Sequence, residues 1–429
     1  MLTLFNHHIR SIHTLRMKNI SIFILALLVS SASFTQTTTQ IIPNTNDSRV
    51  ITTGVPFMLV SPDARSAAMG DMGVATSVDG FSQQYNPAKY AFSETKSGVG
   101  VSFTPYLTRL VNDISISYLT YFNRLNDFSA VSASVKYFSL GEIVLTQDAN
   151  DPGVAVKPNE YAVDVAYALK LHDQFSMAVG LRYFRSALRI GQVDPNANPG
   201  SSFGADITGY YQSEENAYND FNGRWRAGFA LQNLGPKFSY DDGGQDVFQP
   251  TNLRLGGGFD FIFDQNSKLA LTAEVTKYLV PTPPERGTVI EFEDNNGNGV
   301  YDEDDDTLIS EEENVIIAGQ DNDVSFLSGM FQSFGDAPGG FSEELQEFTW
   351  ALGAEYTYNN SFALRAGYFN ESQDKGARQF FALGAGFKYT TIQLDLSYLF
   401  SASRVQSPLE NTLRFSLTFN FGDGSYTEY

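Results

Sequence analysis

Most of the chain consists of segments of about ten residues in which apolar and polar residues alternate. The last of them, residues 413–421, is the clearest, because every second residue is a leucine or a phenylalanine and the residues between are polar. An alternation with a period of two predicts a β-strand with two unlike faces. We count about fourteen such segments, an even number as in bacterial membrane barrels. They begin near Gly98, Asn112, Phe128, Tyr161, Phe175, Ala205, Arg224, Leu253, Lys268, Phe348, Phe362, Phe380, Ile392 and Thr412.

The connections between the predicted strands alternate in length. The short ones are residues 124–127, 172–174, 264–267, 359–361 and 390–391, and the long ones are 146–159, 191–204, 234–252 and 281–347. Short periplasmic turns and long extracellular loops are typical of outer-membrane barrels, whereas a soluble sandwich has no reason to keep this order. We therefore expect an all-β membrane protein. Its fourteen-stranded antiparallel barrel would span residues 97–421, with 281–347 a long acidic extracellular loop.

Several charged residues lie within the predicted strands, at positions that alternate with apolar ones. A charge that faced lipid would cost about 2–4 kcal/mol at the middle of the membrane, so we expect these side chains to face the lumen. Two interpretations remain open: the charges pair and hydrate the lumen, or they form a polar path or contact a plug. The residues are Asp164, Arg182, Glu274, Arg365, Asp395 and Arg414.

The N-terminus reads as an export signal. From Met17 the chain has a short basic start, an apolar run of about ten residues and a small-residue exit, so we expect residues 1–35 to be a signal peptide. Met17 fits better as a start than Met1, and we interpret residues 1–16 as a mis-assigned start. No other segment has about 18 consecutive apolar residues, as a membrane helix requires. Export followed by barrel insertion predicts the outer membrane of a Gram-negative bacterium.

Composition excludes several classes of function. The 28 basic and 49 acidic residues give a net charge of −21, which disfavours nucleic acid as a partner. The chain has no cysteine, and three of its four histidines lie within the first 13 residues, so thiol catalysis, a histidine triad and a multi-histidine metal site are hard to build. The remaining His172 lies beside Asp173 in a predicted turn. We interpret Gly256–Gly258 as allowing close packing or a kink rather than phosphate binding, and we expect no enzyme.

Residues 55–95 break the alternation. The stretch is rich in small residues, with a short helix expected over 64–69 and glycines at positions 70 and 73. A compact segment before a barrel of this size is a natural plug, because an open fourteen-stranded barrel would leak. We therefore assign residues 36–96 to an N-terminal extension and a hatch. Residues 55–60 are either a strand of the plug or a contact to another barrel.

A family resemblance rests on this region. The run 64–75, followed by Asn86, Pro87 and Ala88, resembles the hatch of FadL-type outer-membrane proteins. The closest resemblance within that superfamily is to the PorV-type proteins of type IX secretion systems, and it extends from about residue 55 to the C-terminus. The supporting stretches are residues 61–71, 85–89, 210–215, 221–229 and 232–237. The short tail 422–429 departs from a barrel that ends on its terminal aromatic residue.

The resemblance implies a carrier in outer-membrane lipid. Such proteins bind the C-terminal domain of secreted cargo at a SprA-type translocon and deliver the cargo to an attachment complex that contains a PorU-type sortase. An alternative stays open, a FadL-like transporter of hydrophobic small molecules. Both functions use the same fold, so the fold alone does not separate them.

The long acidic loop contains one metal-binding pattern. Residues 294–305 follow the spacing of a twelve-residue calcium loop, in which Gly299 permits the sharp turn. An aspartate at the twelfth position replaces the usual glutamate, and its shorter side chain should weaken the site. The alternative is an acidic, solvated loop without a metal. The candidate calcium ligands are Asp294, Asn296, Asn298, Val300, Asp302 and Asp305.

Overall fold

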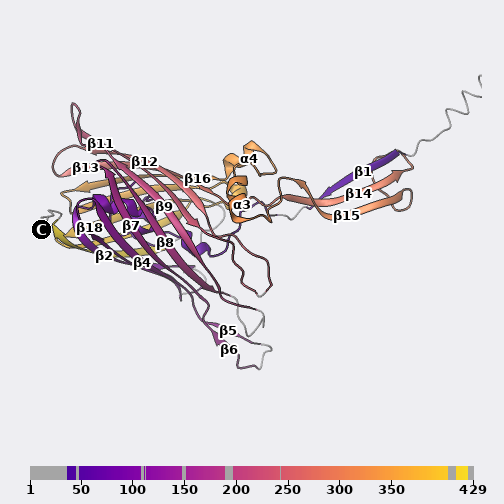
Figure 1. Ribbon diagram of the computed structural model, residues 1–429, viewed down its shortest axis with the longest axis horizontal. Helices are drawn as coiled ribbons and strands as arrows, with labels where there is room; N and C mark the ends of the chain where they lie inside the picture. Colours follow the sequence, from indigo (N-terminus) through magenta and orange to yellow (C-terminus); the bar gives the residue numbers. More distant parts are fainter. Residues whose placement is uncertain are drawn as a thin grey trace, which may run out of the picture. The chain divides into compact units, whose positions relative to one another are not determined.

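The structure, a computed structural model, describes residues 36–44, 48–107, 111, 113–146, 151–188, 197–241, 243–403 and 412–423 (Figure 1). The predicted signal peptide and residues 424–429 of the tail lie outside the described residues. In the part that is described, no helix is long and apolar enough to cross a membrane.

Fourteen antiparallel strands form one closed barrel, which confirms the predicted fold and count. Each strand pairs with its neighbours along the chain, and the last pairs with the first, Phe415 opposite Phe103. The strands are β2 (Thr95–Pro105), β3 (Ile114–Arg124), β4 (Ser129–Leu140), β7 (Asn159–His172), β8 (Phe175–Ala187), β9 (Gly200–Gln212), β11 (Asn222–Leu234), β12 (Asn252–Ile262), β13 (Ser267–Tyr278), β16 (Phe348–Tyr358), β17 (Phe362–Asn370), β18 (Gln379–Tyr389), β19 (Ile392–Ser401) and β20 (Leu413–Asp423).

The largest difference between predicted and observed starts is at β9. This strand begins at Gly200 and not near Ala205. Its first residues, Gly-Ser-Ser-Phe-Gly, lack the apolar alternation from which the other strands were predicted, and their pairing with β8 extends the strand.

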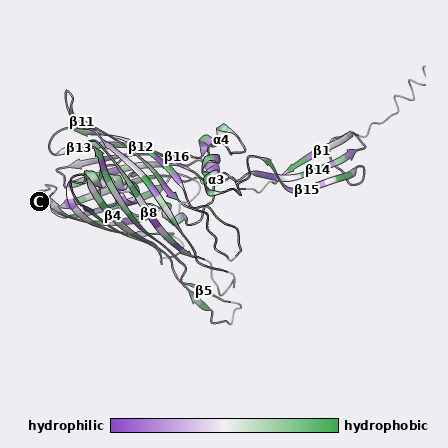
Figure 2. Cartoon of the chain, in the orientation of Figure 1, coloured by the Kyte–Doolittle hydropathy of each residue, from purple (hydrophilic) through white to green (hydrophobic). Residues whose placement is uncertain are grey.

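Hydrophobic and hydrophilic residues alternate along the barrel strands, as predicted (Figure 2). Along β20, Leu413 and Phe415 are exposed on the outside, and Arg414 and Ser416 are buried inside. All six charged residues that we expected to face the lumen are buried. The apolar outer face suits lipid, and the inner face carries the charges.

Connection lengths distinguish the two ends of the barrel. At the short-turn end, tight turns join β3 to β4, β7 to β8, β12 to β13, β16 to β17 and β18 to β19. Asn359, Asn360 and Thr390 adopt positive φ there, which Asn tolerates better than most residues. A longer turn at this end carries β10 (Asn216–Ala217), which pairs with β11. At the long-loop end, β5 (Ile143–Leu145) and β6 (Val154–Val156) form a small hairpin.

Residues 48–94 form the hatch inside the lumen. It contains η1 (Pro56–Leu59), α2 (Ala64–Ala68), η2 (Ser82–Gln84) and η3 (Pro87–Phe92). The expected helix over 64–69 is confirmed as α2, and the carboxylate of Asp63 caps it by accepting from the N–H of Ser66 at 2.9 Å. Residues 55–60 do not form a strand of the plug, and the alternative, a contact to another barrel, stays a prediction. Pro56 begins η1, whose Phe57 and Met58 are buried against side chains of the wall and loops.

The hatch crosses the lumen from the long-loop end to the short-turn end. The N–H of Gly54 donates to the carbonyl of Phe248 in a long loop. At the other end of the hatch, Arg124, the last residue of β3, donates to the carbonyl of Ser93 at 2.8 Å. Thr95, two residues after Ser93, begins the first strand of the barrel.

A second compact unit consists of residues 36–47 and 285–317, and we name it the sheet unit. It is a three-stranded sheet of β1 (Gln36–Pro43), β14 (Glu285–Asp294) and β15 (Thr307–Ala318), with β14 in the middle. β1 pairs antiparallel with β14 along its whole length. The alternation predicts no strand in these residues, which were expected to be an extension and a loop.

Candidate functional site

The Asn86-Pro87-Ala88 motif begins η3 and fastens the hatch to the wall. Oδ1 of Asn86 accepts from the N–H of Ala88 at 3.1 Å, and Nδ2 donates to the carbonyls of Val74 and Gly209, each at 2.9 Å. Pro87 lies in the first turn, where its missing N–H breaks no helical hydrogen bond. The asparagine therefore connects the helix start, the rest of the hatch and β9.

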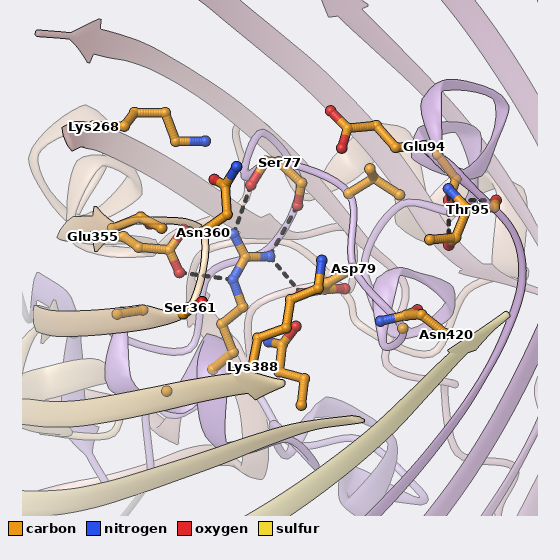
Figure 3. A pocket seen from close by; sticks show the side chains of 18 of the residues that line it. Ser77, Asp79, Glu94, Thr95, Lys268, Glu355, Asn360, Ser361, Lys388 and Asn420 are labelled. Carbon is orange, nitrogen blue, oxygen red and sulfur yellow. Dashed lines mark hydrogen bonds and ion pairs between the residues drawn. The ribbon is translucent and has the colours of Figure 1, made fainter. Parts of the chain in front are cut away.

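A buried guanidinium links α2 to three strands of the wall. Arg65 donates to both carboxylate oxygens of Glu355, at 2.8 and 2.9 Å, and it also contacts Asp79 at 2.6 Å and Ser77 (Figure 3). Glu355 on β16 also accepts from Arg365 on β17 at 2.5 Å. Arg365 in turn contacts Asp395 on β19. Each charge thus has a partner of opposite sign, as burial requires.

Other charges of the wall contact the backbone of the hatch. Glu274 accepts from the N–H groups of Gly73 and Val74, both at 2.9 Å. Lys136 donates to the carbonyls of Met58 and Val60, at 3.1 and 2.7 Å. Arg226 and Arg414 donate likewise to the carbonyls of Ala75 and Ser61. Of the six predicted lumenal charges, four form two pairs, Asp164 with Arg182 and Arg365 with Asp395. Glu274 and Arg414 contact the hatch. Pairing and contact with a plug therefore both occur.

Close packing accompanies these polar contacts. A Cβ added at Gly367 of β17 would overlap the backbone of Met69 and Gly70, and one added at Gly228 of β11 would overlap the carbonyl of Val74. Glycines in the wall therefore let the backbone of the hatch approach the backbone of the barrel.

The glycine run in β12 and the histidine at the end of β7 both have structural roles. Gly256 of β12 faces the hatch, and a Cβ there would lie 2.9 Å from the Cβ of Ala75, so the close-packing interpretation is confirmed. His172 ends β7, and its Nδ1 accepts from the N–H of Gln174 at 3.3 Å within the turn.

A polar cavity of about 300 Å³ lies beside the hatch at the short-turn end (Figure 3). Lys268, Lys388, Asn360 and Glu94 are among its lining residues, together with the Arg65 cluster. Its polar lining suits water and small polar solutes better than a hydrophobic molecule.

At the long-loop end, residues 318–347 form a cap that contains α3 (Phe326–Gln332) and α4 (Phe341–Gln346). Figure 1 shows both helices beyond one end of the barrel strands. Lys277 at the end of β13 contacts Glu347 at 2.6 Å and Glu344 at 3.3 Å. Lys375 contacts the other carboxylate oxygen of Glu347 at 3.0 Å. These buried pairs connect the cap to β13 and to the loop after β17.

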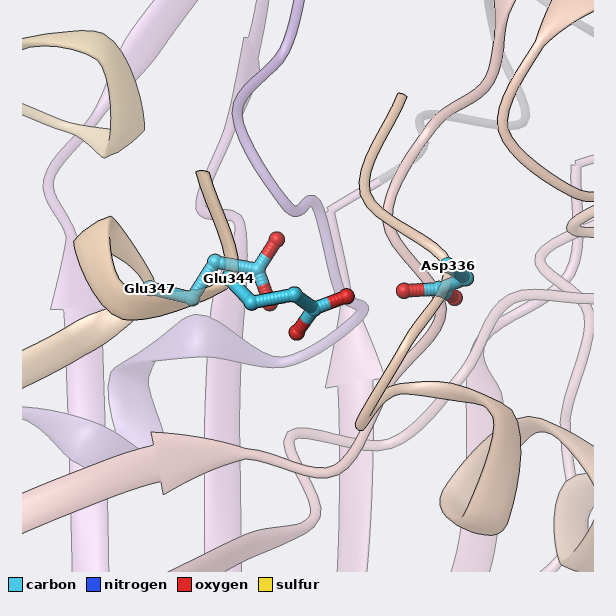
Figure 4. Close-up of side chains that lie close together, drawn as sticks. All are labelled: Asp336, Glu344 and Glu347. Atoms are coloured by element: carbon cyan, nitrogen blue, oxygen red, sulfur yellow. The ribbon is translucent and has the colours of Figure 1, made fainter. Parts of the chain in front are cut away.

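Asp336 completes this cluster of carboxylates (Figure 4). Its Oδ2 accepts from the N–H of Thr282 at 3.0 Å, whereas its buried Oδ1 has no hydrogen-bond partner. Burial raises the pKa of Asp336 to about 6, and the nearby Glu347 and Glu344 act in the same direction. Among the described residues, these are the only three carboxylates with oxygens within 4.8 Å of one another. Lys277 already neutralises part of their charge.

The cap exposes five large apolar side chains. The most exposed, Phe341, keeps 78% of its surface accessible, and the least exposed keeps 53%. Because they belong to helices and connections of a loop, the lipid-facing wall does not account for them. The sequence predicts only a long acidic loop here, and nothing in it indicates the ion pairs that position these side chains. The five residues, which we name the apolar cap surface, are Leu327, Phe331, Phe334, Phe341 and Leu345.

The candidate calcium loop joins β14 to β15 in the sheet unit. Its side-chain oxygens bond to its own backbone: Asp294 accepts from the N–H groups of Gly297 and Gly299, Asn296 from that of Asn298, and Asn298 from that of Val300. Gly297 and Gly299 adopt the positive φ that sharp turns need. Calcium binding at this loop stays a prediction.

Comparison with solved structures found barrels of low identity. A CymD monoaromatic hydrocarbon channel is 13% identical with a TM-score of 0.45, and the match covers 86% of this chain and 99% of that chain. The Pseudomonas putida toluene transporter TodX is 12% identical with a TM-score of 0.44, covering 87% and 98%. A Pseudomonas aeruginosa FadL homologue is 12% identical with a TM-score of 0.43, covering 85% and 99%. Comparison with curated proteins found no match.

A match to a family model identifies the family of this chain. The model described as type IX secretion system protein PorV matches residues 43–285, more than half of the chain. The matched part contains the hatch with its Asn86 motif and the barrel strands through β13. Together with the closed barrel, it identifies an outer-membrane component of a type IX secretion system. The chain belongs to the PorV family.

Proposed function

We propose that this protein receives secreted cargo by its C-terminal domain at a SprA-type translocon and delivers it to a surface complex with a PorU-type sortase. It acts as a carrier without catalysis. The observation that carries the proposal is the apolar cap surface, five large apolar side chains that are each more than half exposed. Exposed apolar patches of this kind mark sites of protein interaction.

The cap suits docking because buried ion pairs fix it. Lys277 and Lys375 both contact Glu347, whose side chain is fully buried. A surface that is ordered before binding loses less conformational entropy when a partner arrives. Large aromatic residues such as Phe331 and Phe341 are also effective anchors at protein interfaces.

The hatch supports a carrier over the alternative, a FadL-like transporter of hydrophobic molecules. Arg65, Glu274 and Lys136 connect it to the wall through buried polar bonds, and the cavity beside it is polar. A hydrophobic solute would have to replace these bonds without offering any in return, which is costly. The experiment below is therefore designed so that a transporter would be recognised by the hydrophobic molecule recovered with it.

The test is a mild-detergent pull-down of the tagged protein from its own outer membrane, with mass spectrometry of proteins and lipids. Wild type should recover a giant translocon, a sortase-containing complex and cargo with a shared C-terminal domain. The double variant Phe331→Ser/Phe341→Ser should recover at least about tenfold less cargo, because the anchors of an interface carry much of its energy.

The matched control is Phe128→Ser, which removes an exposed phenylalanine at the short-turn end. Its recovery of cargo should equal that of wild type. Undiminished cargo with the double variant would show that the apolar cap surface is not the docking site. Recovery of the barrel alone, with a fatty acid or another hydrophobe bound, would support the transporter.

A further inference from the structure

The two edges of the sheet unit are open and differ in chemistry. β14 lies between β1 and β15, so each outer strand offers one edge, and no other strand of the described residues pairs with either. An open edge presents backbone N–H and C=O groups to any extended segment nearby. Natural proteins discourage such pairing with charged side chains on the edge strand.

β15 carries such charges, and β1 does not. Glu311, Glu312 and Glu313 follow one another in the middle of β15 and are all exposed. β1 has the sequence Gln-Thr-Thr-Thr-Gln-Ile-Ile-Pro, with no charged residue. Threonine and isoleucine favour extended backbone, and Pro43 interrupts pairing only at the end of the strand. A strand added to β1 would cover no charged side chain, whereas one added to β15 would have to desolvate three carboxylates. The edge of β1 is therefore the one that accepts a further strand.

The sheet buries Ile290 and Phe292 of β14, but its two outer strands leave apolar side chains exposed. Ile41 on β1 is 55% exposed, and Leu308 and Ile309 on β15 are exposed as well. A sheet normally buries at least one face against a second layer. The exposed apolar side chains give an arriving segment something to pack against besides backbone.

Charge selects the kind of segment. The sheet unit contains 13 acidic residues and one basic residue, Arg286, so its net charge of −12 is more than half of the −21 of the whole chain. Such a field attracts a basic segment and repels an acidic one. It also disfavours a second copy of this chain, whose own sheet unit carries the same charge.

We propose that the free edge of β1 is a strand-addition site for an extended, basic segment of a partner polypeptide. Main-chain hydrogen bonds to β1 supply the pairing, and the acidic unit supplies the preference for positive charge. The site lies in the sheet unit and does not depend on what the apolar cap surface binds.

The first test uses synthetic ten-residue peptides and the full-length protein in detergent micelles. One peptide alternates threonine and lysine, one alternates threonine and glutamate, and one alternates proline and lysine. The threonine–lysine peptide should bind at least about tenfold more tightly than either of the others, measured by fluorescence anisotropy. The proline peptide has the same charge, but it cannot form a strand. Equal binding of the two basic peptides would reduce the effect to electrostatics and overturn strand addition, and equal binding of the acidic peptide would overturn the charge preference.

The second test locates the site. Because the chain has no cysteine, Thr39→Cys on β1 and Thr307→Cys on β15 each introduce a single thiol at an exposed threonine. A threonine–lysine peptide whose terminal cysteine is activated as a 2-pyridyl disulfide should exchange with the thiol of Thr39→Cys, releasing pyridine-2-thione, at least about tenfold faster than with that of Thr307→Cys. Equal rates, or a faster reaction on β15, would contradict the assignment to β1.

Discussion

Charged side chains inside the barrel contact the backbone of the hatch as well as one another. Arg65 joins α2 to Glu355, while Glu274 accepts from two consecutive N–H groups of the hatch. Backbone groups that are buried away from water need such partners, since each unsatisfied one costs about 1–3 kcal/mol. The charged side chains of the wall therefore provide hydrogen-bond partners for the backbone of the irregular hatch, as neighbouring strands do for one another.

Replacing Arg65 should lower the stability of the hatch against local unfolding. Arg65→Met leaves the carboxylates of Glu355 and Asp79 buried with one cation fewer, and breaking a buried pair costs about 3–5 kcal/mol. We expect hydrogen exchange of residues 61–80 in micelles to begin at lower urea than in wild type. The control Arg224→Met breaks a half-exposed pair with Glu215 and should change protection by less than about 1 kcal/mol. Identical exchange in both variants would show that the pair does not hold the hatch.

Asp336 should make the stability of the cap depend on pH. Its pKa is about 6 in the folded cap, above the ordinary 3.8, because burial disfavours the charged form beside Glu344 and Glu347, with Lys277 the nearby cation. The folded cap thus binds this proton more strongly than the unfolded chain does, so the contribution of Asp336 to the stability of the cap is fully present below about pH 4 and is lost as the pH rises through about 6. Asp336→Asn keeps the acceptor for Thr282 and removes the charge.

We therefore expect Asp336→Asn to slow hydrogen exchange of residues 326–347 at pH 8 and to leave it nearly unchanged at pH 4, after correction for intrinsic rates. The control Asp323→Asn alters an exposed carboxylate that contacts Lys237 and should show no such pH dependence. Faster exchange of Asp336→Asn at pH 8 would reverse the assigned sign.

At the scale of the element, the sequence predicted what periodicity can encode. Barrel strands have unlike faces, so their number and their lumenal charges were predictable, as β20 shows with Leu413 and Arg414. The ion pairs of Lys277 with the cap were not, because they join residues about 70 positions apart. Pairing of β1 with β14 was equally hidden, because β1 is rich in threonine without an apolar alternation and its partner strand lies far along the chain.

The β14–β15 connection carries the calcium prediction, and we propose that calcium orders this loop. Calorimetry should show binding with a dissociation constant of about 10⁻⁴–10⁻³ M, as in extracellular modules. Asp294→Ala should abolish the heat, whereas Asp304→Ala, at a position that does not supply a ligand in this pattern, should retain it. Asp305→Glu should tighten binding, because the longer side chain restores the usual bidentate ligand. Absence of heat with millimolar calcium would end the prediction.

At the scale of the whole molecule, the chain passes through the barrel from one end to the other as the hatch. The hatch enters the lumen near Gly54 at the long-loop end and leaves near Ser93 at the short-turn end, where β20 also ends. β1 precedes the hatch and pairs with β14, which belongs to the connection between β13 and β16 at the long-loop end. If short turns face the periplasm, as in outer-membrane barrels, the N-terminal strand lies on the cell surface.

Cysteine labelling of intact cells tests this orientation, and the natural absence of cysteine makes each label specific. A membrane-impermeant maleimide should label Thr39→Cys in β1 and Asn298→Cys in the β14–β15 connection. It should label Asn360→Cys, in the turn between β16 and β17, only after the outer membrane is permeabilised. If Asn298→Cys is labelled but Thr39→Cys is not, β1 does not stay paired with β14 in living cells. Labelling of Asn360→Cys alone would invert the barrel and place both the apolar cap surface and the acidic sheet unit in the periplasm, where neither could receive cargo that has already crossed the membrane.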